Sequence, residues 1–445
     1  MRLPLFIALI FPAVLSMSLA AACSSSSDSP AVSSGESDAQ TSSDVAADSA
    51  DATPPLAYPA FPFDMPNVPS LGGPIVASPN VVAIFDPTDP NKDAIMTFLK
   101  GLESSSFWPQ VTSEYGVGPI ASVTEMDLPS AMGATVAAND LLDLTLSEIH
   151  LSDYADAGPD AAADNDAGDA GVPRTDKIFV IFTPPTTTIS DVSCGELLGY
   201  HASLHLEGNV HVPYAIVQGA CTDTDKATTP LGVELQALGH ELVEAATDPF
   251  PSYDPAFLRV DDDHLGWTVA FGALGQTELN DLCDEPIYIS FGGSSYALAN
   301  VWSNKAAKSG LFPCVPSSSK GPLLMASAVF SEDVPFTSML KTKGITLAVG
   351  KSATIDVHVS SSAALENSFQ ISAVDIASAF YKQPPQMTLS LDKTDVQNGD
   401  VVHLTITRTA LSTAKSVGKG AAFSIRPTSS EASTWMPFYG FVADP

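Results

Sequence analysis

Residues Thr229-Pro-Leu-Gly-Val-Glu-Leu-Gln-Ala-Leu-Gly-His-Glu-Leu-Val-Glu-Ala-Ala-Thr-Asp-Pro249 decide the fold, because they predict one helix with both ends marked. The Thr229 hydroxyl can cap the first turn, and Pro230 suits the first helical position because it has no N–H to leave unsatisfied. Pro249 ends the helix, since the residue before a proline is pushed out of the α region. We therefore expect the rest of the main domain to be organised around this helix.

The predicted helix has two different faces. At about 100° per residue, one face is apolar and consists of Leu231, Leu235, Leu238, Leu242, Ala245 and Ala246. The opposite face carries His240 and Glu244, with Asp248 close by. A solvent-exposed face would pair its acids with Lys or Arg, yet neither occurs between Lys226 and Arg259. An imidazole and two carboxylates without a basic partner indicate a bound cation.

The five residues from His240 to Glu244 resemble the His-Glu-x-x-His signature of zincin metallopeptidases. Glu244 stands where the signature has its second histidine. A carboxylate also ligates zinc, and positions i and i+4 share a helix face, so His240 and Glu244 are the predicted ligands. Glu241, about 100° around the helix, is the predicted general base. Zinc is the expected ion, and the additional carboxylate also admits calcium or manganese.

Four further residues are candidate ligands. Asp248 lies at the C-terminal end of the helix, where the helix dipole repels an anion, so a nearby cation would compensate for it. Glu278 and Asp281 come just before Cys283, a cysteine expected to hold their segment in a disulfide, and His201 lies in a separate stretch. The weaker candidates are His205, His211 and His264. In the alternative interpretation, the helix imidazole and carboxylate only hydrogen-bond each other and nearby backbone.

The N-terminus predicts an envelope protein. Residues 1–22 have the basic start, the apolar core broken by prolines and the small final residues of a signal peptide. Leu19-Ala-Ala-Ala-Cys23 resembles a bacterial lipobox, with its leucine one place earlier than usual. Cys23 would then carry a lipid that anchors the protein in the membrane, and Ser24 favours the outer membrane. The alternative is ordinary cleavage after Ala22, with an incidental cysteine.

The cysteine count agrees with a lipidated first cysteine. Five cysteines are present, and removing Cys23 as the anchor leaves an even number suited to two disulfides in an oxidising compartment. These four are Cys194, Cys221, Cys283 and Cys314. Sequence neighbours are the expected pairs, Cys194 with Cys221 and Cys283 with Cys314, although four cysteines allow three connectivities.

The charge excludes one class of partner. A net charge of −32 argues against nucleic acid, because binding a phosphate backbone needs clustered Lys and Arg. Residues 23–56 are rich in Ser, Asp and Ala, and predict a disordered tether behind the lipid. Residues 153–176 form a second acidic run. Its spacing does not match an EF-hand calcium loop, so a solvated surface insertion is predicted.

Two folded domains are predicted after the tether. Residues 57–316 mix strand-like apolar runs with helical periodicity, which indicates an α/β or α+β domain with zincin-like character built around the metal-motif helix. In residues 320–445 the pattern changes to short alternating runs separated by Gly, Asn and Ser, without cysteine. Together with the turn signal Gln397-Asn-Gly-Asp400, this pattern predicts an immunoglobulin-like β-sandwich.

Several short stretches also carry a family resemblance, namely Gly72-Gly-Pro-Ile-Val76, Val81-Val-Ala-Ile-Phe85, Trp108, Glu114-Tyr-Gly-Val-Gly118, Cys194, Gly199-Tyr-His201, Tyr214-Ala-Ile-Val217, His240–Pro249, Glu278, Asp281-Leu-Cys283 and Trp302-Ser-Asn304. Over nearly the whole folded chain they resemble a group of secreted bacterial lipoproteins of myxobacterial type. More distantly, the middle of the chain is similar to the plant phosphate-induced, EXORDIUM-type extracellular proteins. Neither family has an established reaction, so the resemblance implies an envelope location and a shared site.

These observations lead to two functional hypotheses. In the first, the protein is an outer-membrane lipoprotein with a zincin-like divalent-metal site, acting as a metallopeptidase or related hydrolase. In the second, it is a non-catalytic surface lipoprotein with a structural cation, whose sandwich domain binds a polysaccharide or an extracellular protein. The two differ in what Glu241 does, since only the hydrolase needs a general base.

Overall fold

The computed structural model describes residues 57–148, 176–194, 197–206, 210–222, 229–270, 277–283, 286–317, 321–412, 419–432 and 434–445. They belong to one compact unit, residues 56–445. The predicted signal peptide, Cys23 and the tether lie outside the described residues, as does the predicted acidic insertion except for its last residue. No described helix is both long and apolar enough to cross a membrane.

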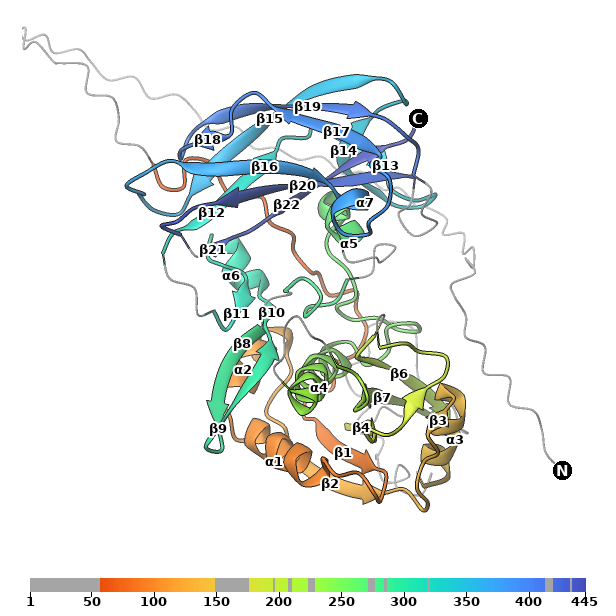
Figure 1. Ribbon diagram of the computed structural model, residues 1–445. Helices are drawn as coiled ribbons and strands as arrows, with labels where there is room; N and C mark the ends of the chain where they lie inside the picture. The colour runs from red at the N-terminus through yellow and green to blue at the C-terminus, as the bar shows by residue number, and fades with distance from the viewer. Residues whose placement is uncertain are drawn as a thin grey trace, which may run out of the picture. The chain divides into compact units, whose positions relative to one another are not determined.

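A five-stranded mixed sheet lies in the first part of the chain (Figure 1), in the order β2-β1-β4-β7-β6. The strands are β1 Asn80–Phe85, β2 Ser122–Asp127, β4 Lys177–Thr183, β6 Gly199–Leu206 and β7 Val210–Gln218. The first four in this order are parallel, and β6 pairs antiparallel with β7. In β1 and β4 nearly every residue is apolar, as expected for strands that are covered on both faces.

Helices cover both faces of this sheet. They are α1 Lys92–Glu103, α2 Phe107–Thr112, α3 Ala138–Glu148 and α4 Pro230–Thr247, with the 3₁₀ turn η1 Ser113–Tyr115 after α2. Phe85 and Phe182 belong to the same buried cluster as residues of α1 and α4, whereas Ile84 and Ile181 cluster with Leu141 of α3. Neighbouring strand residues therefore contact different helices, which follows from the period of two along a strand. A mixed α and β fold is confirmed.

Short elements follow α4 along the chain, and part of them packs against it. They are η4 Asp262–His264, α5 Gly266–Ala270, β8 Pro286–Phe291, β9 Ser294–Ala299, β10 Val301–Trp302, α6 Asn304–Lys308 and β11 Cys314–Val315. Strands β8 and β9 form an antiparallel hairpin, and β9 contacts α4. A Cβ on Gly239 of α4 would come within 3.1 Å of the Leu298 side chain, so the glycine allows this close approach. The hairpin thereby covers part of the helix surface.

The last part of the chain forms two larger sheets (Figure 1), β17-β19-β15-β12-β21 and β13-β14-β22-β20-β16-β18. Their strands are β12 Leu323–Ala328, β13 Glu332–Pro335, β14 Lys341–Thr346, β15 Ser352–Ser361, β16 Phe369–Asp375, β17 Met387–Leu391, β18 Asp395–Val396, β19 Val401–Arg408, β20 Gly420–Thr428, β21 Thr434–Trp435 and β22 Phe438–Ala443. Helix α7 Ile376–Ala379 follows β16, and β3 Thr135–Val136 pairs separately with β5 Thr188–Ile189. Strand β12 contacts β20 and β22 of the other sheet, so the two sheets share a core.

Contacts join the two parts of the described chain. The Trp267 ring of α5 lies edge-on to Trp302 at 6.0 Å and to Tyr439 of β22 at 5.1 Å, both measured between ring centroids. The Leu265 N–H donates to Thr342 Oγ1 at 3.1 Å, and this hydroxyl donates to the Asp263 carbonyl at 3.1 Å. Edge-on aromatic pairs add to the free energy gained by burial, so α5 and its flanking residues stabilise this junction.

His264 forms a charged contact at this junction. Its Nδ1 lies 2.7 Å from Asp261 Oδ1 and its Nε2 lies 3.1 Å from Asp64 Oδ1. Burial lowers the pKa of His264, but the two carboxylates outweigh it and raise the pKa to about 9. In the unfolded chain the pKa of His264 is about 6.5. The interaction of protonated His264 with Asp261 and Asp64 therefore stabilises the fold fully below that pH, and this contribution is lost as pH rises through about 9.

We therefore expect His264→Gln to lower the free energy of unfolding by roughly 1–3 kcal/mol at about pH 6 and by much less at about pH 10. Urea unfolding at the two pH values measures this difference. His403→Gln is the matched control, because His403 Nδ1 also lies 2.7 Å from a carboxylate, Asp392 Oδ2, but in an exposed pair. An equal loss at both pH values would contradict the assigned role of His264.

Candidate metal centre

Helix α4 supplies most of the candidate site. Its ends agree with the sequence: Thr229 Oγ1 accepts a hydrogen bond from the Gly232 N–H at 3.0 Å, Pro230 is the first helical residue, and Asp248 follows the last. The predicted polar face, however, is not open to solvent. Glu241 and Glu244 are 7% and 3% exposed, because β6, β7 and the β8–β9 hairpin all contact the helix. The carboxylates of α4 are therefore interior groups.

Strand β6 brings His201 against the acidic side of α4. The His201 side chain is 3% exposed, and its Nδ1 lies 3.5 Å from Glu241 Oε2 and 3.6 Å from Glu244 Oε2. The close approach depends on Gly199, two residues earlier and on the same face of the strand. A Cβ there would come within 2.9 Å of Glu241 Cγ. Gly199 was not predicted as a site residue from the sequence. The glycine is needed for close contact with another element, and neither a periodic pattern nor a turn signal marks such a contact.

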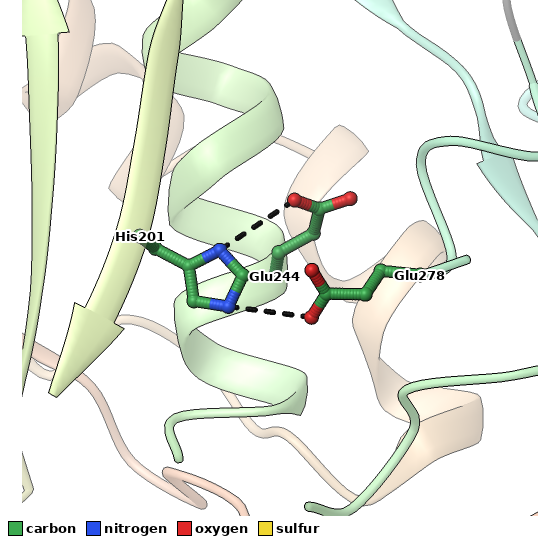
Figure 2. Close-up of side chains that lie close together, drawn as sticks. All are labelled: His201, Glu244 and Glu278. Carbon is green, nitrogen blue, oxygen red and sulfur yellow. Dashed lines mark ion pairs between the residues drawn. The ribbon is translucent and has the colours of Figure 1, made fainter. Parts of the chain in front are cut away.

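Residues 277–283 bring two more carboxylates from the opposite side. The Cys283–Cys314 disulfide holds this segment, and its backbone is fixed further by the Trp302 N–H, which donates to the Leu279 carbonyl at 2.9 Å. Figure 2 shows Glu244 and Glu278 facing the edge of the His201 ring that carries its nitrogens, with one carboxylate at each nitrogen. Glu278 Oε1 lies 3.3 Å from His201 Nε2. Both ring nitrogens of His201 thus face a carboxylate.

His240 lies at the more open edge of the same cluster. Its Nε2 is 3.1 Å from Glu244 Oε1 and 3.6 Å from Asp281 Oδ1. The side chains of His240 and Asp281 are 27% and 39% exposed, whereas Glu244 between them is buried. The cluster can therefore be reached from the solvent through these two residues.

Asp248 lies beside the cluster in a different role. Its Oδ1 accepts a hydrogen bond from the Ala256 N–H at 2.7 Å, and its backbone carbonyl lies 3.2 Å from His201 Nε2. Asp248 belongs to neither group of side chains that could hold a cation. Its backbone carbonyl is instead placed to orient the His201 ring. Among the weaker candidates, His211 stacks on Tyr253 at 4.3 Å between ring centroids, and His264 pairs with Asp261. The side chain of His205 is outside the described residues.

The distances in the cluster match those between ligands of one ion. With bonds of about 2.0–2.2 Å, two tetrahedral ligands of one ion are roughly 3.3–3.6 Å apart. Four of the five carboxylate-to-imidazole distances quoted above run from 3.3 to 3.6 Å, longer than ordinary hydrogen bonds, and the fifth, from His240 Nε2 to Glu244 Oε1, is 3.1 Å. Among the described residues, two groups could each hold a cation: His201 with Glu244 and Glu278, and His240 with Glu241 and Glu244.

Electrostatics explain why a cation would be favourable. Five carboxylates lie in or beside the cluster, namely Glu241, Glu244, Asp248, Glu278 and Asp281. Among the described residues, no Lys or Arg forms an ion pair with any of them. Burial lowers the pKa of both His201 and His240, but the surrounding carboxylates outweigh it and raise each pKa well above 6.5. In the absence of a cation, protons on the imidazoles are thus the charges nearest to the acids.

The carboxyl groups show the same shortage of positive charge. Burial raises the pKa of Glu244 to about 8 and that of Asp248 to about 7, and it also raises the pKa of Glu278. The pKa of Asp281 is lowered, since the His240 imidazole outweighs its burial. A divalent ion would replace the protons held by these groups, as metal ligands must be deprotonated.

The disulfides confirm the cysteine pairing expected from the sequence. Cys194 pairs with Cys221, and Cys283 pairs with Cys314. The first connects the segment before β6 to the end of β7, so it holds the strand that carries His201. The second holds the segment that carries Glu278 and Asp281. Each disulfide therefore fixes one wall of the cluster.

Comparison with known proteins adds no family. No protein-family model and no curated protein matches the chain. Among solved structures, domains 4–9 of the surface layer protein SbsC match 26% of this chain and 14% of their own at 11% identity and a TM-score of 0.16. Domains 4 and 5 of SbsC match 36% of this chain and 65% of their own, at 10% identity and a TM-score of 0.16. A chimeric titin Z1Z2 with a decorin peptide matches 29% of this chain and 98% of its own, at 14% identity and a TM-score of 0.15. The chain thus covers less than two thirds of either SbsC structure, and such TM-scores carry no argument.

The first prediction for this site concerns pH. Glu244 and Asp248, with pKa values of about 8 and about 7, titrate near about 4 in the unfolded chain. A group whose pKa is raised on folding stabilises the fold below its unfolded pKa, and this contribution is lost as pH rises through the folded value. The cation-free chain should lose stability between about pH 5 and 8, and an added cation should restore it.

At a hundredfold excess over its Kd, a cation contributes about 2.7 kcal/mol at the higher pH. The measurement is the melting temperature in EDTA and in excess Mn²⁺ or Zn²⁺ at about pH 5 and 8, with a larger difference expected at pH 8. Glu244→Gln should reduce the pH dependence of this difference. A difference that shrinks as pH rises would overturn the account of the cluster.

The second prediction concerns Gly199. Gly199→Ala should displace Glu241, because the new Cβ would be within 2.9 Å of Glu241 Cγ and 3.0 Å of the Ile216 carbonyl. We expect about a tenfold loss of cation affinity, or about 1.4 kcal/mol, measured by calorimetric titration. Gly133→Ala is the control, because its Cβ would meet only Thr135 backbone at 3.5 Å. Equal affinities for the two variants would argue against a close contact of β6 with the site.

Proposed function

We propose that this protein is a cell-envelope lipoprotein whose α4 cluster binds a divalent cation and hydrolyses peptide or related bonds. One observation carries the proposal: two imidazoles and four carboxylates from three separate elements converge at ligand-like distances, and among the described residues no Lys or Arg pairs with these carboxylates. Four carboxylates around two imidazoles leave uncompensated negative charge in a mostly buried cluster, which is costly, so a bound cation is the arrangement that suits it.

The proposed hydrolytic centre uses His240, Glu244 and Asp281 as ligands and Glu241 as general base. A bound divalent ion would polarise a carbonyl and lower the pKa of water. Glu241 belongs to the same group as His240 and Glu244, so its carboxylate can accept a proton from a water at that position. Substrate would approach past His240 and Asp281, the two most exposed members. Zinc is the first choice of metal, with manganese or calcium as alternatives.

The envelope location rests on the N-terminal sequence and on the two disulfides. The signal peptide, the lipobox-like Leu19–Cys23 and the resemblance to secreted lipoproteins support it. Disulfides persist in oxidising compartments, in agreement with a site outside the cytoplasm. We also propose that residues 320–445 are an immunoglobulin-like sandwich and a separate domain, for which the two sheets and their shared core are the support.

The burial of Glu241 and Glu244 favours a second candidate function. Both side chains are less than one tenth exposed, which is also expected of a structural cation site. In that case the protein is a non-catalytic surface lipoprotein, adhesin-like, that binds an extracellular protein or a polysaccharide.

Glu241→Gln distinguishes the two functions. In a hydrolase it should lower kcat by roughly 10²- to 10⁴-fold, while the metal content and the melting temperature stay as in the wild type. The measurements are elemental analysis of the full chain and hydrolysis of a mixed fluorogenic peptide library. His240→Ala should lose metal and stability under either function, and His403→Ala, in an exposed pair, is the control.

Each outcome decides a separate point. If the wild-type chain neither retains nor takes up a stoichiometric metal, the proposed metal site is wrong, and so is the proposed hydrolase activity. Retained metal with no difference between Glu241→Gln and the wild type would support the structural cation. Loss of metal from Glu241→Gln would contradict the role of Glu241 as a base beside the ion.

A further inference from the structure

Glu244 faces two different imidazoles with its two oxygens. We infer that the centre holds two divalent cations and that the Glu244 carboxylate bridges them. One position lies next to His240 and Asp281, and the other lies next to His201 and Glu278. This inference rests on the proposed function and adds a second ion to it.

The orientation of Glu244 is the first support. Its Oε1 lies 3.1 Å from His240 Nε2, and its Oε2 lies 3.6 Å from His201 Nδ1. The side chain is almost fully buried, and Oε1 receives no hydrogen bond. A buried carboxylate oxygen without a hydrogen bond is costly unless a cation or proton satisfies it. Oε1 is therefore placed for a cation next to His240, and Oε2 faces the second imidazole, His201.

The separation of the two imidazoles is the second support. Glu244 belongs to both ligand groups found among the described residues, yet neither group contains both His201 and His240. Two atoms bound to one ion at about 2.2 Å can be no more than roughly 4.4 Å apart. A single ion would therefore use one imidazole and leave the other outside its coordination sphere. Two ions about 3.5–4 Å apart, as in two-metal hydrolases, would use both.

Charge is the third support. Glu241, Glu244, Glu278, Asp281 and Asp248 carry five negative charges when ionised, and neutral imidazoles add none. One divalent cation and one protonated, unligated imidazole would leave two of these charges uncompensated in a mostly buried cluster, whereas two divalent cations would leave one.

Groups around His201 also fit a ligand rather than a simple ion pair. One ring nitrogen is enough to bind an ion, and ligating histidines donate their other N–H to a carboxylate or backbone carbonyl. The Asp248 carbonyl lies 3.2 Å from His201 Nε2 and can accept its N–H, which leaves Nδ1, the nitrogen that faces Glu244 Oε2, for the ion. One imidazole with several carboxylates at each position favours Mn²⁺ or Zn²⁺ over softer ions.

The test is a titration of the full chain with Mn²⁺ after removal of metals by a chelator. Bound Mn²⁺ is counted by elemental analysis and examined by electron paramagnetic resonance. We expect two ions per chain and, at saturation, the spectrum of an exchange-coupled pair. His201→Gln and His240→Gln should each bind one ion without coupling, and His403→Gln should bind two.

The outcomes separate this inference from the proposed function. One Mn²⁺ per wild-type chain, or two with no coupling, would overturn the bridged pair and leave a single-ion centre intact. A chain that binds neither Mn²⁺ nor Zn²⁺ would overturn both. Circular dichroism checks that each variant is folded, and the wild-type spectrum decides the question even if a variant does not fold.

Discussion

The structure depends on the burial of a helix that carries acids on its polar side. Helix α4 packs its leucines against the sheet, but its other side is also covered, so Glu241 and Glu244 lie in the interior. The free energy of transferring a carboxylate from water into a protein interior is unfavourable by several kcal/mol after relaxation. That side is covered by β6, the edge strand of the sheet that carries His201, and by the segment that carries Glu278 and Asp281. The elements that cover it create a strongly negative site and require a counter-charge.

The scaffold around the cluster is built to hold it in one arrangement. β6 approaches α4 closely because Gly199 has no side chain, and the disulfide between Cys194 and Cys221 fixes the segments that flank the β6–β7 pair. On the opposite side, Cys283–Cys314 fixes the segment with Glu278 and Asp281. Side chains held by rigid elements lose little further entropy on binding, so such a cluster is preorganised for a ligand. The disulfides therefore contribute to the site as well as to the fold.

Much of the fold could be predicted from the sequence. The apolar run Lys177–Thr183 is a buried strand, and the helix begins and ends at the predicted cap and proline, because these signals are local and depend on few neighbours. What covers the polar face of α4 could not be predicted. The missing Lys and Arg argued against an ordinary solvent-exposed face, but the contacts with His201 of β6 and the approach of Glu278 come from other parts of the chain. Helical periodicity describes one element and contains no information on what packs against it from elsewhere.

By itself, the sequence determined which chemistry is available: a His-Glu-x-x-Glu helix without basic neighbours, and acids just before a disulfide cysteine. Tertiary structure decided which of the seven candidate residues meet. It places His201 between Glu244 and Glu278, puts His240 beside Asp281, and gives the Asp248 side chain to the Ala256 N–H. The physical reason is that ligand geometry requires atoms to lie within a few ångströms. Three elements well separated in sequence reach that distance only through strand pairing, helix packing and disulfides.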